Sequence, residues 1–173
     1  QSKDIHRGKI FYVALPYTQG RPFRFVEKDG QHEDLYRIIE RPDGFEGVSE
    51  PETGKRRSES LEVVTGIKLR PCIIIQKDQY NHNEKYPFVV VLPIAKEHKQ
   101  RPIFKRLIEH NDLDQFYYLG NDCYITVNDP KRVYKNTLFY VEGRLKIEES
   151  DIDMDELMMR FAECLAVKKI RSE

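Results

Sequence analysis

The sequence predicts a mainly β fold with some α-helix: a small barrel with a C-terminal helix and a long loop inserted between its first two core strands. Two continuous apolar runs, Cys72–Gln76 and Phe88–Ile94, are flanked by prolines or polar loops. Such runs are typical of strands that are buried on both faces, as in a small barrel. A further strand is predicted ahead of them, at Lys9–Leu15.

The C-terminal helix has the clearest periodicity in the chain. Apolar residues recur at three- and four-residue steps between Ile152 and Leu165, as expected for a helix with one buried face. Asp153 and Glu156 have the spacing of a capping pair at its start. The side chains that share this apolar face also suit a dimer interface, namely Met154, Met158 and Phe161.

Shorter apolar segments predict the remaining elements. Strands are expected at Cys123–Val127, Thr137–Val141 and Gly143–Ile147, and helices at Ile103–Glu109 and Leu113–Leu119. Asp129-Pro130 marks a turn between two of these segments.

The insertion covers about residues 17–66 and has a different composition. It is rich in glycine, proline and charges of both signs, and its best candidates for order are Leu35–Glu40 and Leu61–Val64. We expect it to hold a small hairpin or a helical turn, because a structureless loop of this length is uncommon in a compact domain. Its composition leaves open whether it is an elaborated binding loop or a passive insertion.

The bulk composition indicates one domain, residues 1–173, with this insertion inside it. Lys+Arg and Asp+Glu both number 29, so the chain has no net charge that would attract nucleic acid. Local cationic clusters must supply any such attraction. No apolar run approaches the roughly 18 residues of a membrane helix, and no signal peptide is evident, so we expect a cytoplasmic protein with no membrane partner.

Cysteine and histidine give no pattern of metal ligands. Cys72, Cys123 and Cys164 are scattered and indicate small buried thiols in a reducing compartment. The five histidines lie in polar surroundings without the spacing of a metal site, and His32 and His98 are kept as candidate acids or bases. The sequence therefore predicts neither a metal nor a cofactor.

The order of the short motifs resembles the MazF/PemK family of toxin endoribonucleases. The motifs are Arg7 to Val13, Pro16 to Gly20, Arg70-Pro71 and Val89 to Ala95, and the likeness extends over residues 6–16, 67–95 and 120–167. The resemblance implies an SH3-like barrel that cleaves single-stranded RNA, mRNA included, without a metal. It also implies 2′,3′-cyclic phosphate and 5′-hydroxyl products, a homodimer, and an acidic antitoxin as the partner.

The same resemblance indicates the site residues. Arg70 matches the arginine of the family's Arg-Pro pair, and Lys131 or Arg132 takes the place of a later arginine. The residues assigned to catalysis are Arg70 and Lys131, and those assigned to RNA binding are Lys68, Lys96, Lys99, Arg132 and Tyr17. An arginine suits this chemistry because it binds phosphate through two parallel hydrogen bonds and stabilises charge that builds up on the phosphate oxygens.

Two alternatives remain open from the sequence. The threonine that ends the family's Pro-Ile-Thr motif falls on Ala95, which has no hydroxyl for a phosphate. This favours a catalytically inactive barrel that binds RNA or protein. A gyrase inhibitor of the CcdB type is the weaker alternative, because that activity is associated with a C-terminal tryptophan and this chain has no tryptophan.

Overall fold

The computed structural model describes residues 4–16, 23–32, 34–41, 48–49, 51–57, 62–96, 102–140, 147 and 149–165. The chain divides into two compact units, one formed by Gln1–Ala14 with Leu69–Glu173 and the other by Leu15–Lys68. The smaller unit covers the insertion that the sequence predicted at residues 17–66. The assignment of the whole chain to one domain stays a prediction.

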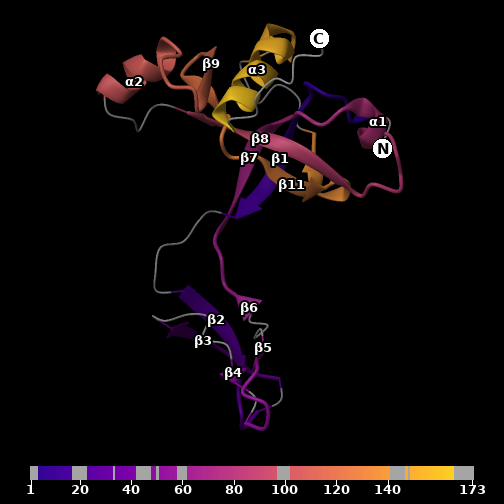
Figure 1. Cartoon of the computed structure of the whole chain (residues 1–173), viewed down its shortest axis with the longest axis vertical. Coiled ribbons are helices and arrows are strands. Elements are labelled where there is room, and N and C mark those ends of the chain that lie inside the picture. Colours follow the sequence, from indigo (N-terminus) through magenta and orange to yellow (C-terminus); the bar gives the residue numbers. More distant parts are fainter. Residues whose placement is uncertain are drawn as a thin grey trace. The chain divides into compact units, whose positions relative to one another are not determined.

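The main sheet has seven strands (Figure 1). They are β1 (Ile10–Pro16), β7 (Ile67–Ile74), β8 (Phe88–Lys96), β9 (Phe116–Gly120), β10 (Cys123–Thr126), β11 (Lys131–Tyr134) and β12 (Leu138–Phe139). The strand order is β12-β1-β7-β8-β10-β9, and β11 pairs with β8. This is the predicted mainly β architecture. The pairs β1–β12, β7–β8, β8–β10, β8–β11 and β9–β10 are antiparallel.

The long strand β8 organises the sheet. Its middle residues, Val91 to Pro93, pair with β7. Its first residues also pair with β11, and its last residues pair with β10. Ile73 and Ile74 of β7 are both fully buried, as are Val91 and Leu92 of β8. The central strands are therefore buried on both faces, as the uninterrupted apolar runs predicted.

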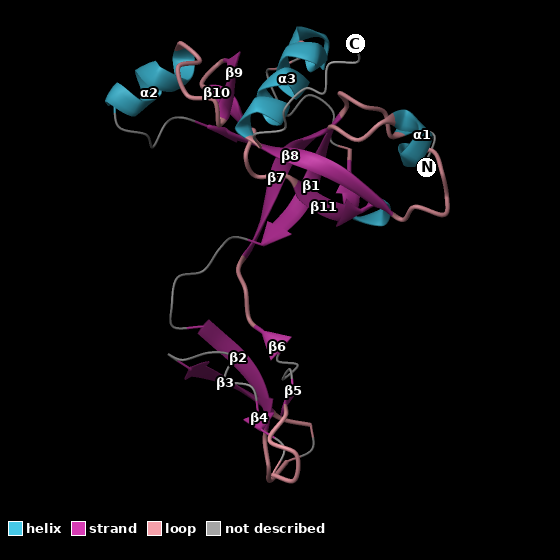
Figure 2. Cartoon of the chain, in the orientation of Figure 1, coloured by secondary structure: helices cyan, strands magenta, loops and turns pink. Residues whose placement is uncertain are grey.

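Helix α3 (Met154–Cys164) covers one face of this sheet (Figure 2). Leu157 is fully buried in the core, and Met154, Met158 and Phe161 pack against it. The Asp153 carboxylate accepts hydrogen bonds from the backbone N–H groups of Asp155 and Glu156, which caps the helix as the sequence predicted. The apolar face that suited a dimer interface is thus used for packing within the chain, and the homodimer stays a prediction.

Other helical elements are short. They are α1 (Asp78–Asn81), α2 (Pro102–Glu109), η2 (Lys135–Thr137) and η3 (Glu149–Asp151). Helix α2 confirms the helix predicted at Ile103–Glu109. The predicted strand at Thr137–Val141 is reduced to β12, and most of the one predicted at Gly143–Ile147 lies outside the described residues.

The helix predicted at Leu113–Leu119 is wrong, because most of this segment belongs to strand β9. The aromatic run Phe116-Tyr117-Tyr118 favours a strand, in which Tyr117 is buried and pairs with Ile125 of β10. A tight turn follows at Gly120, Asn121 and Asp122, whose φ angles are 79°, 50° and 57°. These left-handed conformations reverse the chain into β10.

The smaller unit is built on a hairpin, which confirms one of the two structures expected for the insertion. Its elements are β2 (Phe23–Lys28), β3 (Tyr36–Arg41) and β6 (Glu62–Val63) in one sheet, with β4 (Val48–Ser49) paired to β5 (Arg56–Arg57). Phe25 of β2 is fully buried and anchors this unit.

Candidate active site

The strand pairing determines which side chains share the face of Arg70. Val91 of β8 pairs with Ile74 of β7 on one side and with Lys131 of β11 on the other. Residues directly opposite one another in a sheet lie on the same face, and so do residues two apart in one strand. Arg70 and Cys72 therefore share a face with Ile74, Val91 and Lys131. We call this side of β7, β8 and β11 the Arg70 face.

Cys72 lies on the Arg70 face, and its thiol is buried, with 0% of the residue exposed. Burial raises the pKa of Cys72 to about 12, the Arg70 guanidinium acts to lower it, and the Asp129 carboxylate acts to raise it. Lys131 forms an ion pair with Asp129. Arg70 and Asp129 thus both influence the same buried side chain, although they are about 60 residues apart in the sequence.

The neighbouring cation, Arg132, lies on the opposite face. It pairs with Val90 of β8, and its guanidinium carbon lies 4.7 Å from the centre of the Phe88 ring. Such a cation–π contact holds the arginine over an aromatic side chain of its own sheet. Of the two residues that compete for the family's later arginine, Lys131 is the one on the Arg70 face.

Ala95 lies at the same end of the strand pair as Arg70. Cys72 of β7 pairs with Pro93 of β8. Arg70 lies two residues before Cys72 and Ala95 two residues after Pro93, which is the same direction in antiparallel strands. Ala95 is half-buried and pairs with Tyr124 of β10. The position that the family fills with threonine therefore adjoins the Arg70 end, with a methyl group instead of a hydroxyl.

A family model supplies the decisive comparison. The model described as "PemK-like, MazF-like toxin of type II toxin-antitoxin system" matches residues 62–165, which include Arg70, Ala95 and Lys131. The chain belongs to this family. The matched residues begin at strand β6, so most of the insertion precedes them.

A solved structure is also similar to this chain. It is described as "Endoribonuclease in complex with its cognate antitoxin from Mycobacterial species". The two share 13% sequence identity with a TM-score of 0.41, over 58% of this chain and 84% of the other. No curated protein matches the sequence. Within the described residues, no helix is both long enough and apolar enough to cross a membrane.

The other residues predicted to bind RNA are spread more widely over the chain. Lys96 is exposed at the end of β8, where strand alternation directs it to the face opposite that of Ala95. Lys68 is exposed on β7 and belongs to the smaller unit. Lys99 and Tyr17 lie outside the described residues, as does the candidate acid or base His98. The other candidate, His32, lies in the smaller unit, 3.6 Å from an Asp29 oxygen.

Two further lysines, Lys105 and Lys135, have structural contacts. Lys105 lies 2.7 Å from an Asp122 carboxylate oxygen, where it links α2 to the turn before β10. The Lys135 ammonium donates to the carbonyl oxygens of Tyr80 and Asn83, at 3.1 and 2.9 Å. Burial lowers the pKa of Lys135, against an opposing effect of Glu84. These contacts make both residues parts of the scaffold.

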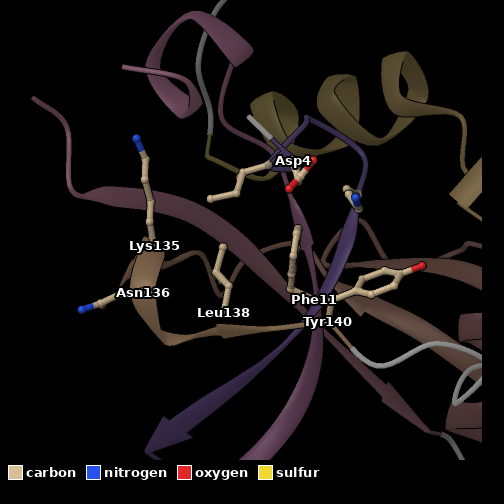
Figure 3. A pocket seen from close by; sticks show the side chains of 8 residues that line it. Asp4, Phe11, Lys135, Asn136, Leu138 and Tyr140 are labelled. Atoms are coloured by element: carbon tan, nitrogen blue, oxygen red, sulfur yellow. The ribbon is translucent and has the colours of Figure 1, made fainter. Parts of the chain in front are cut away.

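An aromatic pocket of about 400 Å³ lies at the start of β1 (Figure 3). It is lined by Asp4, Ile5, Lys9, Phe11, Lys135, Asn136, Leu138 and Tyr140. The ring centres of Phe11 and Tyr140 are 6.1 Å apart, and the Lys9 ammonium lies 5.7 and 5.1 Å from them. Two aromatic rings with a cation can stack on an unpaired base. Sequence reasoning missed this pocket because its sides come from segments about 130 residues apart.

The pocket is separated from the Arg70 end of the sheet. The Lys9 carbonyl accepts a hydrogen bond of 3.0 Å from the Ile74 N–H. Ile74 lies four residues along β7 from Arg70, which corresponds to roughly 13 Å of strand.

Proposed function

We propose that this chain is the toxin of a toxin–antitoxin pair and that it cleaves single-stranded RNA, mRNA included, without a metal ion. The products would be a 2′,3′-cyclic phosphate and a 5′-hydroxyl. Family membership supports the toxin assignment. The observation that supports the chemistry is that strand pairing puts Arg70 and Lys131, whose ion-pair partner is Asp129, on one face of β7, β8 and β11.

The proposed reaction begins when the 2′-oxygen attacks the adjacent phosphorus. A bond forms between these two atoms, the bond from phosphorus to the 5′-oxygen breaks, and negative charge builds up on the phosphate oxygens. Arg70 stabilises this charge with its planar guanidinium, which can donate two parallel hydrogen bonds to a phosphate. A single well-placed donor of this kind is worth about 10²–10³-fold in rate.

Asp129 and Lys131 suit the remaining roles. A carboxylate beside the site can accept the 2′ proton, and we assign that role to Asp129. Lys131 supplies a positive charge that can bind the phosphate. Its ammonium group also carries a proton that it can donate, and it forms an ion pair with the Asp129 carboxylate. The proton that the 5′-oxygen needs comes from Lys131 or from water.

The aromatic pocket is suited to hold a neighbouring base. Tyr140 is 61% exposed, so its ring is accessible to a ligand. Stacking on an aromatic side chain is worth about 1–3 kcal/mol per base and depends little on its identity. Binding there would position the strand without determining where it is cut.

An acidic, partly disordered antitoxin is the partner that we propose. The cations of the Arg70 face would attract an acidic segment as they would attract an RNA backbone. Such a segment would cover the site and prevent cleavage.

One observation favours a second candidate function. Ala95 cannot donate a hydrogen bond to phosphate, so the same surface could bind RNA or protein without cleaving it. Affinity for RNA with no cleavage by wild-type protein would support this alternative.

The test is cleavage of a long mixed-sequence single-stranded RNA in the presence of EDTA. We expect wild-type protein to cut, Arg70→Lys to cut weakly, and Arg70→Ala to lose about 10²–10³-fold in rate. Asp129→Asn should lower the rate about 10²–10⁴-fold if Asp129 is the base. Equal cleavage by wild type and Arg70→Ala would contradict the mechanism.

A further inference from the structure

Three metal-ligating side chains come together at the opposite end of β7 from Arg70. His6 precedes β1, and Asp78 and His82 lie at and just after α1, four residues apart. One ligand atom from each of the three lies within 4.8 Å of the others. His6 Nδ1 is 3.4 Å from an Asp78 carboxylate oxygen, and the two imidazole rings meet edge to face with their centres 4.8 Å apart.

Asp78 is held in place by the surrounding chain. Its Oδ1 accepts hydrogen bonds from the Arg7 N–H, at 2.6 Å, and from the Asn81 side-chain amide, at 3.2 Å. Asn81 is 0% exposed, and its amide also donates to the Gln76 carbonyl at 2.9 Å while its oxygen accepts from the Gln76 side chain at 3.1 Å. The other carboxylate oxygen, Oδ2, is the one near His6.

This arrangement is typical of the support around a metal ligand. Outer groups that hold a ligating carboxylate orient it and leave one oxygen directed at the metal. The hydrogen bonds to Oδ1 from the Arg7 N–H and the Asn81 amide provide this support for Asp78.

We propose that His6, Asp78 and His82 bind one divalent transition-metal ion, with Zn²⁺ as the best match. Two imidazoles and one carboxylate, with a fourth position left for water, form a common zinc ligand set. Imidazole suits Zn²⁺, Cu²⁺ and Ni²⁺, whereas Mg²⁺ and Ca²⁺ prefer oxygen ligands only.

The present geometry needs only a small adjustment to close around the ion. Zinc bonds of about 2.0–2.2 Å in a tetrahedron put neighbouring ligand atoms roughly 3.4 Å apart. The His6–Asp78 distance already has that value. Both histidines are exposed, so their rings can turn toward the ion without disturbing the core.

The bound metal would connect two segments that are 72 residues apart in the sequence. It would fix the chain just before β1 to the loop after β7, and it would stabilise the folded state because an unfolded chain has no preformed site. Arg70 lies eight residues before Asp78, at the far end of β7, so this metal would have no part in RNA cleavage.

The test is a Zn²⁺ titration of the full, untagged chain after chelator treatment, in competition with a chromophoric chelator. We expect one zinc per chain, a rise in Tm on adding zinc, and at least a tenfold loss of affinity in both His6→Ala and His82→Ala. Two matched controls should keep wild-type affinity: His110→Ala removes an exposed histidine elsewhere, and Cys164→Ser removes a half-buried free thiol.

A second measurement keeps the proposal testable even if a variant folds poorly. In wild-type protein, zinc should shift the imidazole nitrogen NMR signals of His6 and His82 and leave those of His110 unchanged. Absence of zinc binding by wild type, or shifts at His110 without shifts at His6 and His82, would overturn the proposal. RNA cleavage is read separately in EDTA, so failure of one proposal leaves the other standing.

Discussion

The two faces of strands β7, β8 and β11 have different chemistry, although alternate residues of the same short strands form them. One face carries Ile73, Leu92 and Ile94, which join the core that α3 covers. The Arg70 face carries buried Ile74 and Val91, with Lys131 level with them on β11, and then, toward one end of β7, Cys72 and Arg70. Because side chains alternate along a strand, a shift of one residue separates a packing position from a candidate catalytic one. Lys131 and Arg132 are the clearest example.

The largest effect is expected from the packing face. Leu157→Ala removes a fully buried side chain of α3 and should lower the free energy of unfolding by about 2–5 kcal/mol. Met159→Ala, in the same helix but 54% exposed, should change it by about 0.5 kcal/mol or less. Urea denaturation measures both. Similar losses in the two variants would show that α3 does not pack as described.

On the Arg70 face, Ala95→Thr should increase cleavage. A hydroxyl at this half-buried strand position can donate to a phosphate oxygen, and a hydrogen bond to a charged group is worth about 1.5–3 kcal/mol. We therefore expect roughly a 10–100-fold rise in kcat/KM. Ala95→Val is the matched control, because it adds similar bulk without a hydroxyl. If both variants behave alike, the missing hydroxyl has no role.

A smaller effect is expected at the aromatic pocket. Tyr140→Ala should weaken the binding of single-stranded RNA by about 5–100-fold, from the loss of one stacking ring. Tyr134→Ala removes a tyrosine that is 52% exposed and lies against Phe88, on the face of Arg132. Fluorescence anisotropy with a short labelled RNA measures both affinities. A greater loss with Tyr134→Ala would move the binding surface to the other face.

The smallest effect at neutral pH concerns Cys72. Its pKa is about 12 in the folded protein and 9.0 in its ordinary state, so the unfolded chain releases this proton first as the pH rises. Its contribution to stability is complete below pH 9 and is lost as the pH rises toward 12. Cys72→Ala should flatten the fall in unfolding free energy over this window. An unchanged pH dependence would show that the thiol is not buried in solution.

Much of the fold was predictable because it depends on local patterns. The apolar runs around Ile73 and Val90 predicted buried strands, and the three- and four-residue steps predicted α3 with its Asp153 cap. The segment Leu113–Leu119 was misassigned because a short aromatic run fits a helix or a strand until its partner β10 is known. Strand β11 was missed for a similar reason, since its pairing with β8 is a long-range contact.

The candidate site was predictable in its residues but not in its geometry. Arg70 followed from its motif, whereas the choice of Lys131 over Arg132 required the register of β11 against β8. The His6–Asp78–His82 cluster was missed because His6 is distant in sequence from the other two. The four-residue spacing of Asp78 and His82 was the one local signal that pointed to it.

The most direct test of the central claim compares two neighbouring residues on opposite faces. We would measure the rate of RNA cleavage in EDTA for Lys131→Ala and Arg132→Ala, with folding checked by circular dichroism. If the Arg70 face is the active site, Lys131→Ala should lose about 10–100-fold in rate, as one charged phosphate contact is worth about 1.5–3 kcal/mol, and Arg132→Ala less than about threefold. The reverse order, or equal losses, would contradict the assignment of catalysis to the Arg70 face.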